Sequence, residues 1–146
     1  MIVEKTESVK DIAEILRISD DRLEKQLPCT KGEWVQWLMT MIGKKNAIGV
    51  WIAREEENKP ILGYVVAVNS ITPPISNSVL ILYSTICLVG SDEVNGIAIE
   101  RIKSWASELG AKKLSLFTDH PQLSRRYGFV ESEGISVMTM ELSRNE

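Results

Sequence analysis

The chain has 146 residues, of which 44% are hydrophobic and 25% are charged, and its formal net charge is −3 at neutral pH. This length and composition are typical of a globular protein with one core, so we expect a single domain over residues 1–146. The mildly acidic balance, without a block of basic residues, argues against nucleic acid as a partner.

Three features of the sequence indicate the cellular compartment of the protein: the start of the chain, the longest apolar run and the cysteines. Residues 1–4 lack the basic start and apolar core of a signal peptide. The run over residues 79–89 is interrupted by polar residues and is too short to cross a bilayer. Cys29 and Cys87 are far apart and have no metal-ligand spacing. We therefore expect a reduced, cytoplasmic protein with no metal and no membrane partner.

The first part of the chain is expected to hold a strand and two helices. Residues 2–5 form a short strand. Ser8 and Asp11 have the spacing of a capping box, with Asp in the position usually held by Glu. Residues 9–16 carry an apolar stripe at three- and four-residue spacing, which is typical of an amphipathic helix. Residues 20–26 are predicted to form a second helix, which ends before a proline.

A third helix is predicted to begin at a fuller capping box, formed by Thr30 and Glu33. Trp34 and Trp37 follow on the apolar face of this helix. Such a pair more often packs in a core, but it could also line a pocket for an acceptor molecule. The sequence leaves both interpretations open.

Three strands in a meander are predicted next. Residues 47–54 alternate between apolar side chains on the two faces, and residues 61–68 form an apolar return strand after a charged loop, 55–60. Gly63 within the return strand indicates a bulge or a close approach of the backbone. The third strand, residues 78–89, is rich in Val, Ile and Leu.

A strand–helix–strand unit begins with this third strand. A polar turn, residues 90–95, leads into an amphipathic helix over residues 96–109, and Gly110 is placed to end that helix in a left-handed conformation. Residues 113–118 form the next strand. A helical connection of this length is typical of two parallel strands.

The turn before this helix has one clear physical use. The first turn of a helix presents unpaired N–H groups and a partial positive charge, which can hold an anion. Gly96 has no Cβ, so a ligand could approach its backbone closely. Alternatively, Asn95 or Asp92 simply caps the helix and Gly96 is a turn residue.

The end of the chain is expected to complete the sheet. A short helix over residues 121–127 ends at Gly128, a strand begins at residues 129–130, and a further strand covers residues 135–142. The predicted fold is therefore α/β, with a mixed, mostly antiparallel central sheet of about seven strands and helices on both faces. No G-x-G-x-x-G follows a strand, which excludes a Rossmann domain.

Two segments carry a resemblance to a known family. Residues 86–98 match the strand-four and pyrophosphate-loop motif, Q/R-x-x-G-x-G/A, of the GNAT family of acyl-CoA-dependent N-acetyltransferases. Residues 123–129 match the late F-Y-x-x-x-G-F segment of the same family. The predicted order of elements also resembles the family over nearly the whole chain. The resemblance implies the GNAT fold and acetyl-CoA as co-substrate.

The resemblance also implies a set of site residues. Tyr83 and Ser124 are the candidates for catalysis. Backbone N–H groups of residues 87–89 are expected to polarise the thioester carbonyl. The residues expected to bind acetyl-CoA lie in the strand, the turn, the start of the helix and the end of the following strand: Cys87, Leu88, Val89, Glu93, Val94, Asn95, Gly96, Ile97, Ala98 and Thr118.

The chain departs from the family pattern at positions that matter for the chemistry. Glu93 stands where the family has Gln or Arg, and its charge would repel a pyrophosphate group. Ser124 takes the place of the tyrosine that often donates a proton to the leaving thiolate, and the preceding strand offers no carboxylate as a general base. Tyr83 or Tyr127 could substitute, although either could equally be a packing residue.

These features predict an N-acetyltransferase that moves an acetyl group from acetyl-CoA to a primary amine of a small molecule or a peptide. A homodimer is one compatible assembly. The alternative is a GNAT-like domain that has lost catalysis and works as a binding or regulatory module. Gly96 and Ala98 favour the enzyme, whereas Glu93 and Ser124 favour the module.

Overall fold

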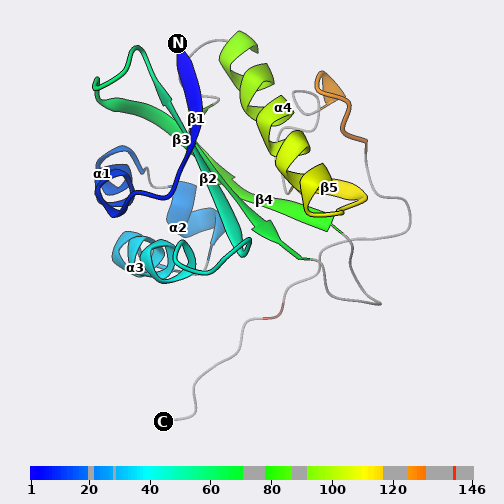
Figure 1. Ribbon diagram of the computed structural model, residues 1–146. Helices are drawn as coiled ribbons and strands as arrows, with labels where there is room; N and C mark the ends of the chain where they lie inside the picture. The colour runs from blue at the N-terminus through cyan, green and yellow to red at the C-terminus, as the bar shows by residue number, and fades with distance from the viewer. Residues whose placement is uncertain are drawn as a thin grey trace.

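The computed structural model describes residues 1–19, 22–27, 29–70, 78–86, 92–116, 125–130 and 140. In chain order the elements are β1 (Ile2–Thr6), α1 (Val9–Ile18), α2 (Arg22–Gln26), α3 (Lys31–Met41), β2 (Ile48–Arg54), β3 (Ile61–Asn69), β4 (Ser78–Ser84), α4 (Asp92–Glu108) and β5 (Lys113–Leu116) (Figure 1). In the described part of the chain, no helix is both long and apolar enough to span a lipid bilayer.

The strands form one mixed sheet in the order β1-β2-β3-β4-β5. The first three pairings are antiparallel, and β4 pairs with β5 in parallel through the crossover helix α4. Helices α1 to α3 lie on one face of the sheet and α4 on the other (Figure 1). The mixed sheet, the parallel unit and the helices on both faces were all predicted from the sequence.

The predicted number of strands is corrected by the structure. The described residues form five strands, not about seven. Residues 129 and 130, predicted to begin a sixth strand, are described and are not in a strand. The predicted seventh strand, 135–142, lies outside the described residues except for Met140, which is exposed and not in a strand. Val130 is 87% exposed, so its side chain lacks the cross-strand packing that stabilises a residue in a sheet.

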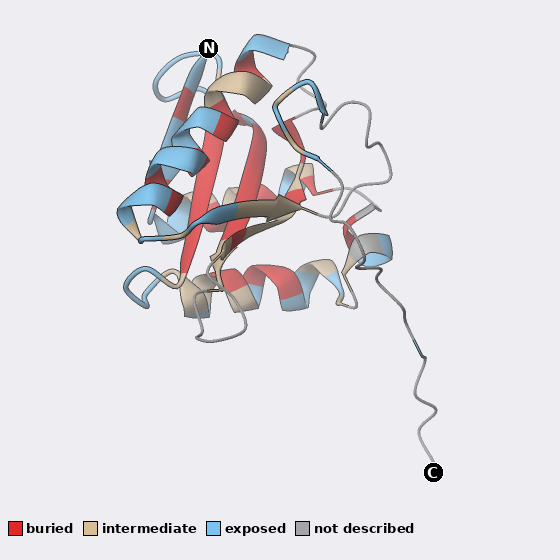
Figure 2. Cartoon of the chain, turned by 90° about the vertical axis from the view of Figure 1, so that its right-hand side faces the viewer, coloured by how far each residue is buried: buried red, intermediate tan, exposed pale blue. Residues whose placement is uncertain are grey.

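Each face of the sheet has its own core, and Figure 2 shows buried residues along the strands and on the inner sides of the helices. The core beneath the first three helices, here called the α1–α3 core, contains Ile12, Ile15, Leu23, Trp34, Val35, Leu38, Ile48, Val50, Ile52, Ile61, Tyr64, Val66 and Tyr83. The core beneath α4, here called the α4 core, contains Val3, Trp51, Ala53, Val65, Ala67, Val79, Ile86, Val94, Ala98, Ile102, Trp105 and Ala106.

The two predicted capping boxes have different outcomes. The Thr30–Glu33 box is confirmed, because the Glu33 N–H donates to Thr30 Oγ1 at 3.2 Å and the Thr30 N–H donates to Glu33 Oε1 at 3.1 Å. The Ser8–Asp11 box is wrong, since the Ser8 side chain makes no cap hydrogen bond. The Asp11 carboxylate instead accepts a hydrogen bond from Arg54 Nη2 at 2.7 Å, so a tertiary contact replaces the capping interaction.

A bulge next to Gly63 is tied to α1 by charged side chains. Ala53 pairs with Gly63 and Arg54 with Ile61, which leaves one extra residue in β3. The Ile61 N–H donates to Glu14 Oε1 and the Ile61 carbonyl accepts from Arg17 Nη2, both at 2.9 Å. Side chains of α1 therefore satisfy both backbone groups of Ile61, at the start of β3 and beside the bulge.

Candidate functional site

The pairing of β3 with β4 is irregular near the carboxyl end of β4. Val66 of β3 pairs with Tyr83, but the next residue, Ala67, pairs with Ile81, so β4 contains one extra residue. The parallel pairing with β5 ends at Ile81 and Leu116 in the described part of the chain. In open α/β sheets, the carboxyl ends of parallel strands next to a helix N-terminus are where ligands bind.

Helix α4 begins earlier than predicted. It runs from Asp92 to Glu108, whereas the sequence suggested a start at Gly96 after a turn over residues 90–95. The acidic residues Asp92 and Glu93 lie in its first turn, where the helix dipole favours negative charge and so stabilises an early start. Gly96 is thus in the second turn of the helix and is not the residue that opens it.

The first turn of α4 is contacted by the short segment 125–128. The Tyr127 hydroxyl lies 3.3 Å from Asp92 Oδ1 and 3.4 Å from the Asp92 carbonyl oxygen, and it donates to this pair of acceptors. Arg126 Nη1 lies 3.6 Å from Asp92 Oδ2, with both side chains well exposed. Exposed ion pairs of this kind contribute little to stability, so their main effect here is to lower the local negative charge.

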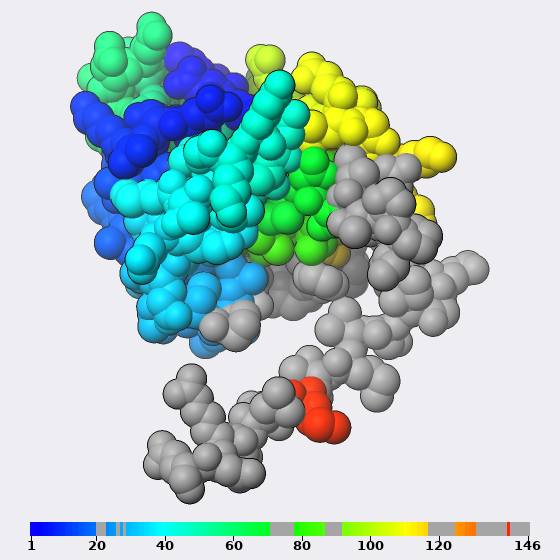
Figure 3. All heavy atoms as spheres, turned by 60° about the horizontal axis from the view of Figure 1, so that its bottom comes forward, coloured from blue at the N-terminus to red at the C-terminus, as the bar shows by residue number. Residues whose placement is uncertain are grey.

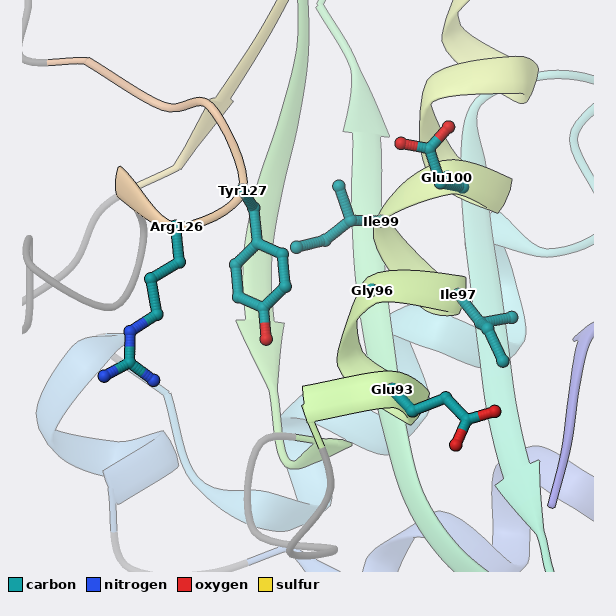
Figure 4. A pocket seen from close by; sticks show the side chains of 7 residues that line it. All are labelled: Glu93, Gly96, Ile97, Ile99, Glu100, Arg126 and Tyr127. Carbon is teal, nitrogen blue, oxygen red and sulfur yellow. The ribbon is translucent and has the colours of Figure 1, made fainter.

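A groove of about 540 Å³ lies between α4 and this segment (Figure 4). Its lining is Glu93, Gly96, Ile97, Ile99, Glu100, Arg126 and Tyr127. The ring of Tyr127 lies against the helix at Gly96, where an added Cβ would be 3.8 Å from Tyr127 Cε1. The Glu93 side chain points away from Arg126 and Tyr127 in this view. Any larger side chain at position 96 would therefore occupy the groove.

The predicted cofactor-binding residues of α4 separate by helix face. Glu93, Gly96 and Ile97 line the groove, and Asn95 is half-buried. Val94 and Ala98 are buried in the α4 core. The remaining predicted residues lie outside the described part of the chain: Cys87, Leu88, Val89, Thr118 and Ser124. Their roles in binding or catalysis stay predictions.

Tyr83, the other predicted catalytic residue, is in the α1–α3 core. Its side chain is 2% exposed, and its ring centroid lies 6.1 Å from that of Trp34 and 5.6 Å from that of Tyr64. Figure 3 shows the side of the molecule on which α3 lies next to β4. This burial favours a packing role for Tyr83, and its catalytic role stays a prediction.

Three residues that line the groove were not predicted from the sequence: Ile99, Glu100 and Arg126. Ile99 and Glu100 follow the motif that carried the resemblance, but they lie about one helical turn beyond Gly96 and so share its face. Arg126 was not predicted as a site residue, although it precedes Tyr127 in the segment matched to the family. Two successive basic residues, Arg125 and Arg126, were the available signal.

Cys29 lies between α2 and α3, and its surroundings favour the protonated thiol. Burial raises the pKa of this thiol above its usual value, and the nearby carboxylates of Glu33 and Glu24 raise it further. The protonated form of a thiol is a weak nucleophile and a poor metal ligand, so these surroundings disfavour either role for Cys29.

Neither the family models nor the curated proteins contain a match to this sequence, but solved structures match the fold. A GNAT family acetyltransferase from Staphylococcus aureus superposes with a TM-score of 0.67 at 15% identity, over 97% of this chain and 98% of that chain. A predicted acetyltransferase from Clostridium acetobutylicum, solved with acetyl-CoA, has a TM-score of 0.70 at 20% identity, over 94% and 95% of the two chains.

An aminoglycoside antibiotic 6'-N-acetyltransferase from Acinetobacter haemolyticus also matches, with a TM-score of 0.70 at 12% identity, over 98% of this chain and 100% of that chain. The chain has the GNAT fold. At these identities the likeness establishes the arrangement of the chain alone. In the GNAT fold of this protein, most residues that line the groove come from the two segments that carried the sequence resemblance: Glu93, Gly96, Ile97, Arg126 and Tyr127.

Proposed function

We propose that this protein is an acyl-CoA-dependent N-acetyltransferase that moves an acetyl group from acetyl-CoA to a primary amine. The observation that carries the proposal is the β4–α4–β5 unit, in which the first turn of α4 follows the irregular end of β4 within a GNAT fold. The Clostridium acetobutylicum structure that shares this fold holds acetyl-CoA, which supports acetyl-CoA as the co-substrate here.

The proposed binding mode uses the backbone of α4. The first four N–H groups of a helix have no partner within it, so the turn that starts at Asp92 offers donors for a pyrophosphate group. The groove beside Gly96 and Ile97 would take a further part of the cofactor. In this mode the backbone does most of the binding, so the departures in the side-chain motif weaken binding without abolishing it.

The proposed chemistry relies on positioning and on backbone polarisation of the thioester. N–H groups of residues 87–89 would stabilise the developing oxyanion, and holding the amine against the carbonyl would supply much of the rate. Ser124 and Tyr83 remain the candidates for proton transfer. The acceptor would be an amine of a small molecule or a peptide, in line with the aminoglycoside substrate named for the Acinetobacter haemolyticus enzyme. A homodimer stays compatible with the proposal.

One observation favours the alternative, a binding or regulatory module without catalysis. Asp92 and Glu93 place two carboxylates in the first turn of α4, where the cofactor phosphates would bind. Arg126 and Tyr127 offset the charge of Asp92, but Glu93 has no cation within ion-pair distance among the described residues. Weak or absent binding of acetyl-CoA would therefore support the module.

The test of the proposal is ligand-linked stability. Acetyl-CoA should raise the melting temperature, because a ligand at a hundred times its Kd adds about 2.7 kcal/mol to the free energy of unfolding. Gly96→Glu should abolish the shift, because its side chain would enter the groove and add a negative charge. The matched control is Gly32→Glu, the same change at an exposed glycine in α3, which should leave the shift intact. No shift for the unmutated protein would contradict the proposal.

A further inference from the structure

The hydroxyl of Thr85, just after the last residue of β4, is hydrogen-bonded to the backbone of β3. The Thr85 N–H donates to the Tyr64 carbonyl at 2.8 Å, as in a regular antiparallel ladder. The Tyr64 N–H, however, donates to Thr85 Oγ1 at 3.0 Å, where a regular ladder would use the Thr85 carbonyl. The Thr85 hydroxyl therefore replaces its own carbonyl, which frees the backbone to turn out of the sheet at this residue while it stays attached.

A second hydroxyl supports the same turn. The Ile86 N–H donates to Ser84 Oγ at 3.2 Å, a local bond that favours a turn over an extended strand. Thr85 is 3% exposed and Ile86 is fully buried in the α4 core. The direction in which the chain leaves β4 is thus set by specific bonds in a buried environment, where each bond is worth more than in water.

Tyr64, the hydrogen-bond partner of Thr85, is itself hydrogen-bonded to residues of α3 and of the end of α1. The Tyr64 side chain is fully buried, and its hydroxyl accepts from Trp34 Nε1 at 3.1 Å. Ser19 Oγ donates to the Ile15 carbonyl at 3.0 Å. Because serine has one hydroxyl hydrogen, the 2.8 Å contact between Ser19 Oγ and the Tyr64 hydroxyl must have Tyr64 as its donor.

These bonds connect the last turn of α1 and the first part of α3, through Tyr64, to the point where β4 ends. The stretch 87–89, whose N–H groups are predicted to polarise the thioester, begins two residues after Thr85. A rotation of the backbone at Thr85 would change the direction of everything that follows, and a small misplacement of an oxyanion donor is costly for catalysis.

We infer that Thr85 is a positioning residue of the proposed acyl-transfer site: its hydroxyl, bonded to the Tyr64 N–H, sets the direction in which the chain leaves β4 and thereby orients the donors for the acetyl carbonyl. The inference rests on the proposed function. It predicts that the hydroxyl of Thr85 matters to the bound acetyl group and not to the rest of the cofactor.

The test compares Thr85→Val, which keeps the shape and removes the hydroxyl, with Thr85→Ser, which keeps the hydroxyl. Isotope-edited infrared spectroscopy of carbonyl-¹³C acetyl-CoA measures polarisation directly, because hydrogen bonding lowers the carbonyl stretching frequency. Binding of acetyl-CoA and of CoA is measured by calorimetry in parallel. CoA lacks the carbonyl and reports binding of the remainder of the cofactor.

In the unmutated protein the carbonyl band should move to lower frequency on binding, and Thr85→Ser should retain this shift. Thr85→Val should lose most of it, with acetyl-CoA affinity lowered about threefold to tenfold, the equivalent of one hydrogen bond. Its CoA affinity should be unchanged. If Thr85→Val does not fold, Thr85→Ala removes the hydroxyl without placing a methyl group against the Tyr64 N–H.

The outcomes separate the inference from the function on which it rests. If the hydroxyl-free variants bind acetyl-CoA with the full carbonyl shift, or lose CoA affinity to the same extent, Thr85 has no positioning role and the proposed function stands. If the unmutated protein does not bind acetyl-CoA, the proposed function fails and the inference is overturned with it.

Discussion

Trp34 and Trp37 stack on each other, and their different burial decides between the two interpretations that the sequence left open. Their ring centroids are 5.5 Å apart with an interplanar angle of 17°. Trp34 is 3% exposed and donates its indole N–H to Tyr64, whereas Trp37 is half-buried at the margin of the α1–α3 core. Packing in the core, one of the two interpretations open from sequence, is confirmed for Trp34.

Glu93 is the residue whose charge most directly opposes the proposed cofactor binding, and Glu93→Gln should improve it. The carboxylate is exposed at the groove and would face the phosphates of acetyl-CoA through solvent. Exposed charge interactions are worth about 0.2–1 kcal/mol, so the affinity for acetyl-CoA should rise by up to roughly fivefold. Calorimetric titration at low and at high salt measures the effect, which should shrink as salt screens it.

The matched control for this change is Glu100→Gln, in the same groove. Its carboxylate lies 3.1 Å from Lys103 Nζ, so its charge is already partly offset, and the acetyl-CoA affinity should change less. Equal gains from both variants would mean that only the net charge of the protein matters. Unchanged or weaker binding in Glu93→Gln would mean that Glu93 does not oppose the phosphates.

At the scale of elements, β2 depends on a glycine that the sequence did not single out. Gly49 and Trp51 lie on the same face of the strand, two residues apart, and the indole of Trp51 folds back over Gly49. An added Cβ at Gly49 would be 2.6 Å from Trp51 Cζ3, closer than real Cβ atoms come. Trp51 also packs edge-on against Trp105 of α4, with centroids 5.3 Å apart. Gly49 therefore makes room for the contact that joins β2 to α4.

Gly49→Ala should destabilise the protein, because the new methyl group forces Trp51 out of its position. Overpacking of a core typically costs about 1–3 kcal/mol in the free energy of unfolding. Urea unfolding followed by circular dichroism measures the loss. The control is Gly32→Ala in α3, where the nearest atom to an added Cβ is 3.9 Å away and alanine should stabilise the helix slightly.

A double-mutant cycle assigns the cause of this loss. In a Trp51→Leu background the clash is absent, so the same Gly49→Ala change should cost much less. An equal cost in both backgrounds would show that the loss comes from the backbone of β2 and not from the tryptophan.

At the scale of the whole molecule, the two cores share one sheet and each contains its own tryptophan pair. Trp34 and Trp37 belong to the face of α1 to α3, while Trp51 and Trp105 belong to the face of α4. Strands β2, β3 and β4 contribute side chains to both cores, so neither face can lose its packing without loosening the other. The protein should therefore unfold as one cooperative unit.

Two variants make this cooperativity measurable. Replacing Trp34 and Trp37 by Phe leaves fluorescence that reports the α4 core, and replacing Trp51 and Trp105 by Phe leaves fluorescence that reports the α1–α3 core. Within each variant, the urea midpoint from fluorescence should equal the midpoint from far-ultraviolet circular dichroism. A fluorescence midpoint that departs from the circular dichroism midpoint in either variant would show that the two faces unfold separately.

The sequence by itself determined the type and order of most elements, because periodicity and local bonding are read from near neighbours. The alternation of residues 47–54, the stripe of α4 and the Thr30–Glu33 capping box all depend on side chains within a few positions of one another. Gly110 also has the expected positive φ of 83° at the end of α4. The parallel β4–α4–β5 unit follows from these local patterns and their spacing, whereas the GNAT fold was implied by the resemblance of residues 86–98 and 123–129 to the family.

Only the tertiary structure decided the features that depend on partners far along the chain. Asp11 accepts a hydrogen bond from Arg54 and does not form the predicted capping box with Ser8, because β2 places the Arg54 guanidinium 2.7 Å from its carboxylate. Tyr83 is buried because α3 covers that part of β4 with Trp34, and Arg126 and Tyr127 meet the first turn of α4 across 35 positions of sequence. The hydroxyl bond between Thr85 and Tyr64 likewise joins two strands whose separate sequences carry no sign of it. The free energy of such contacts comes from groups brought together by the sheet, so no local pattern records them.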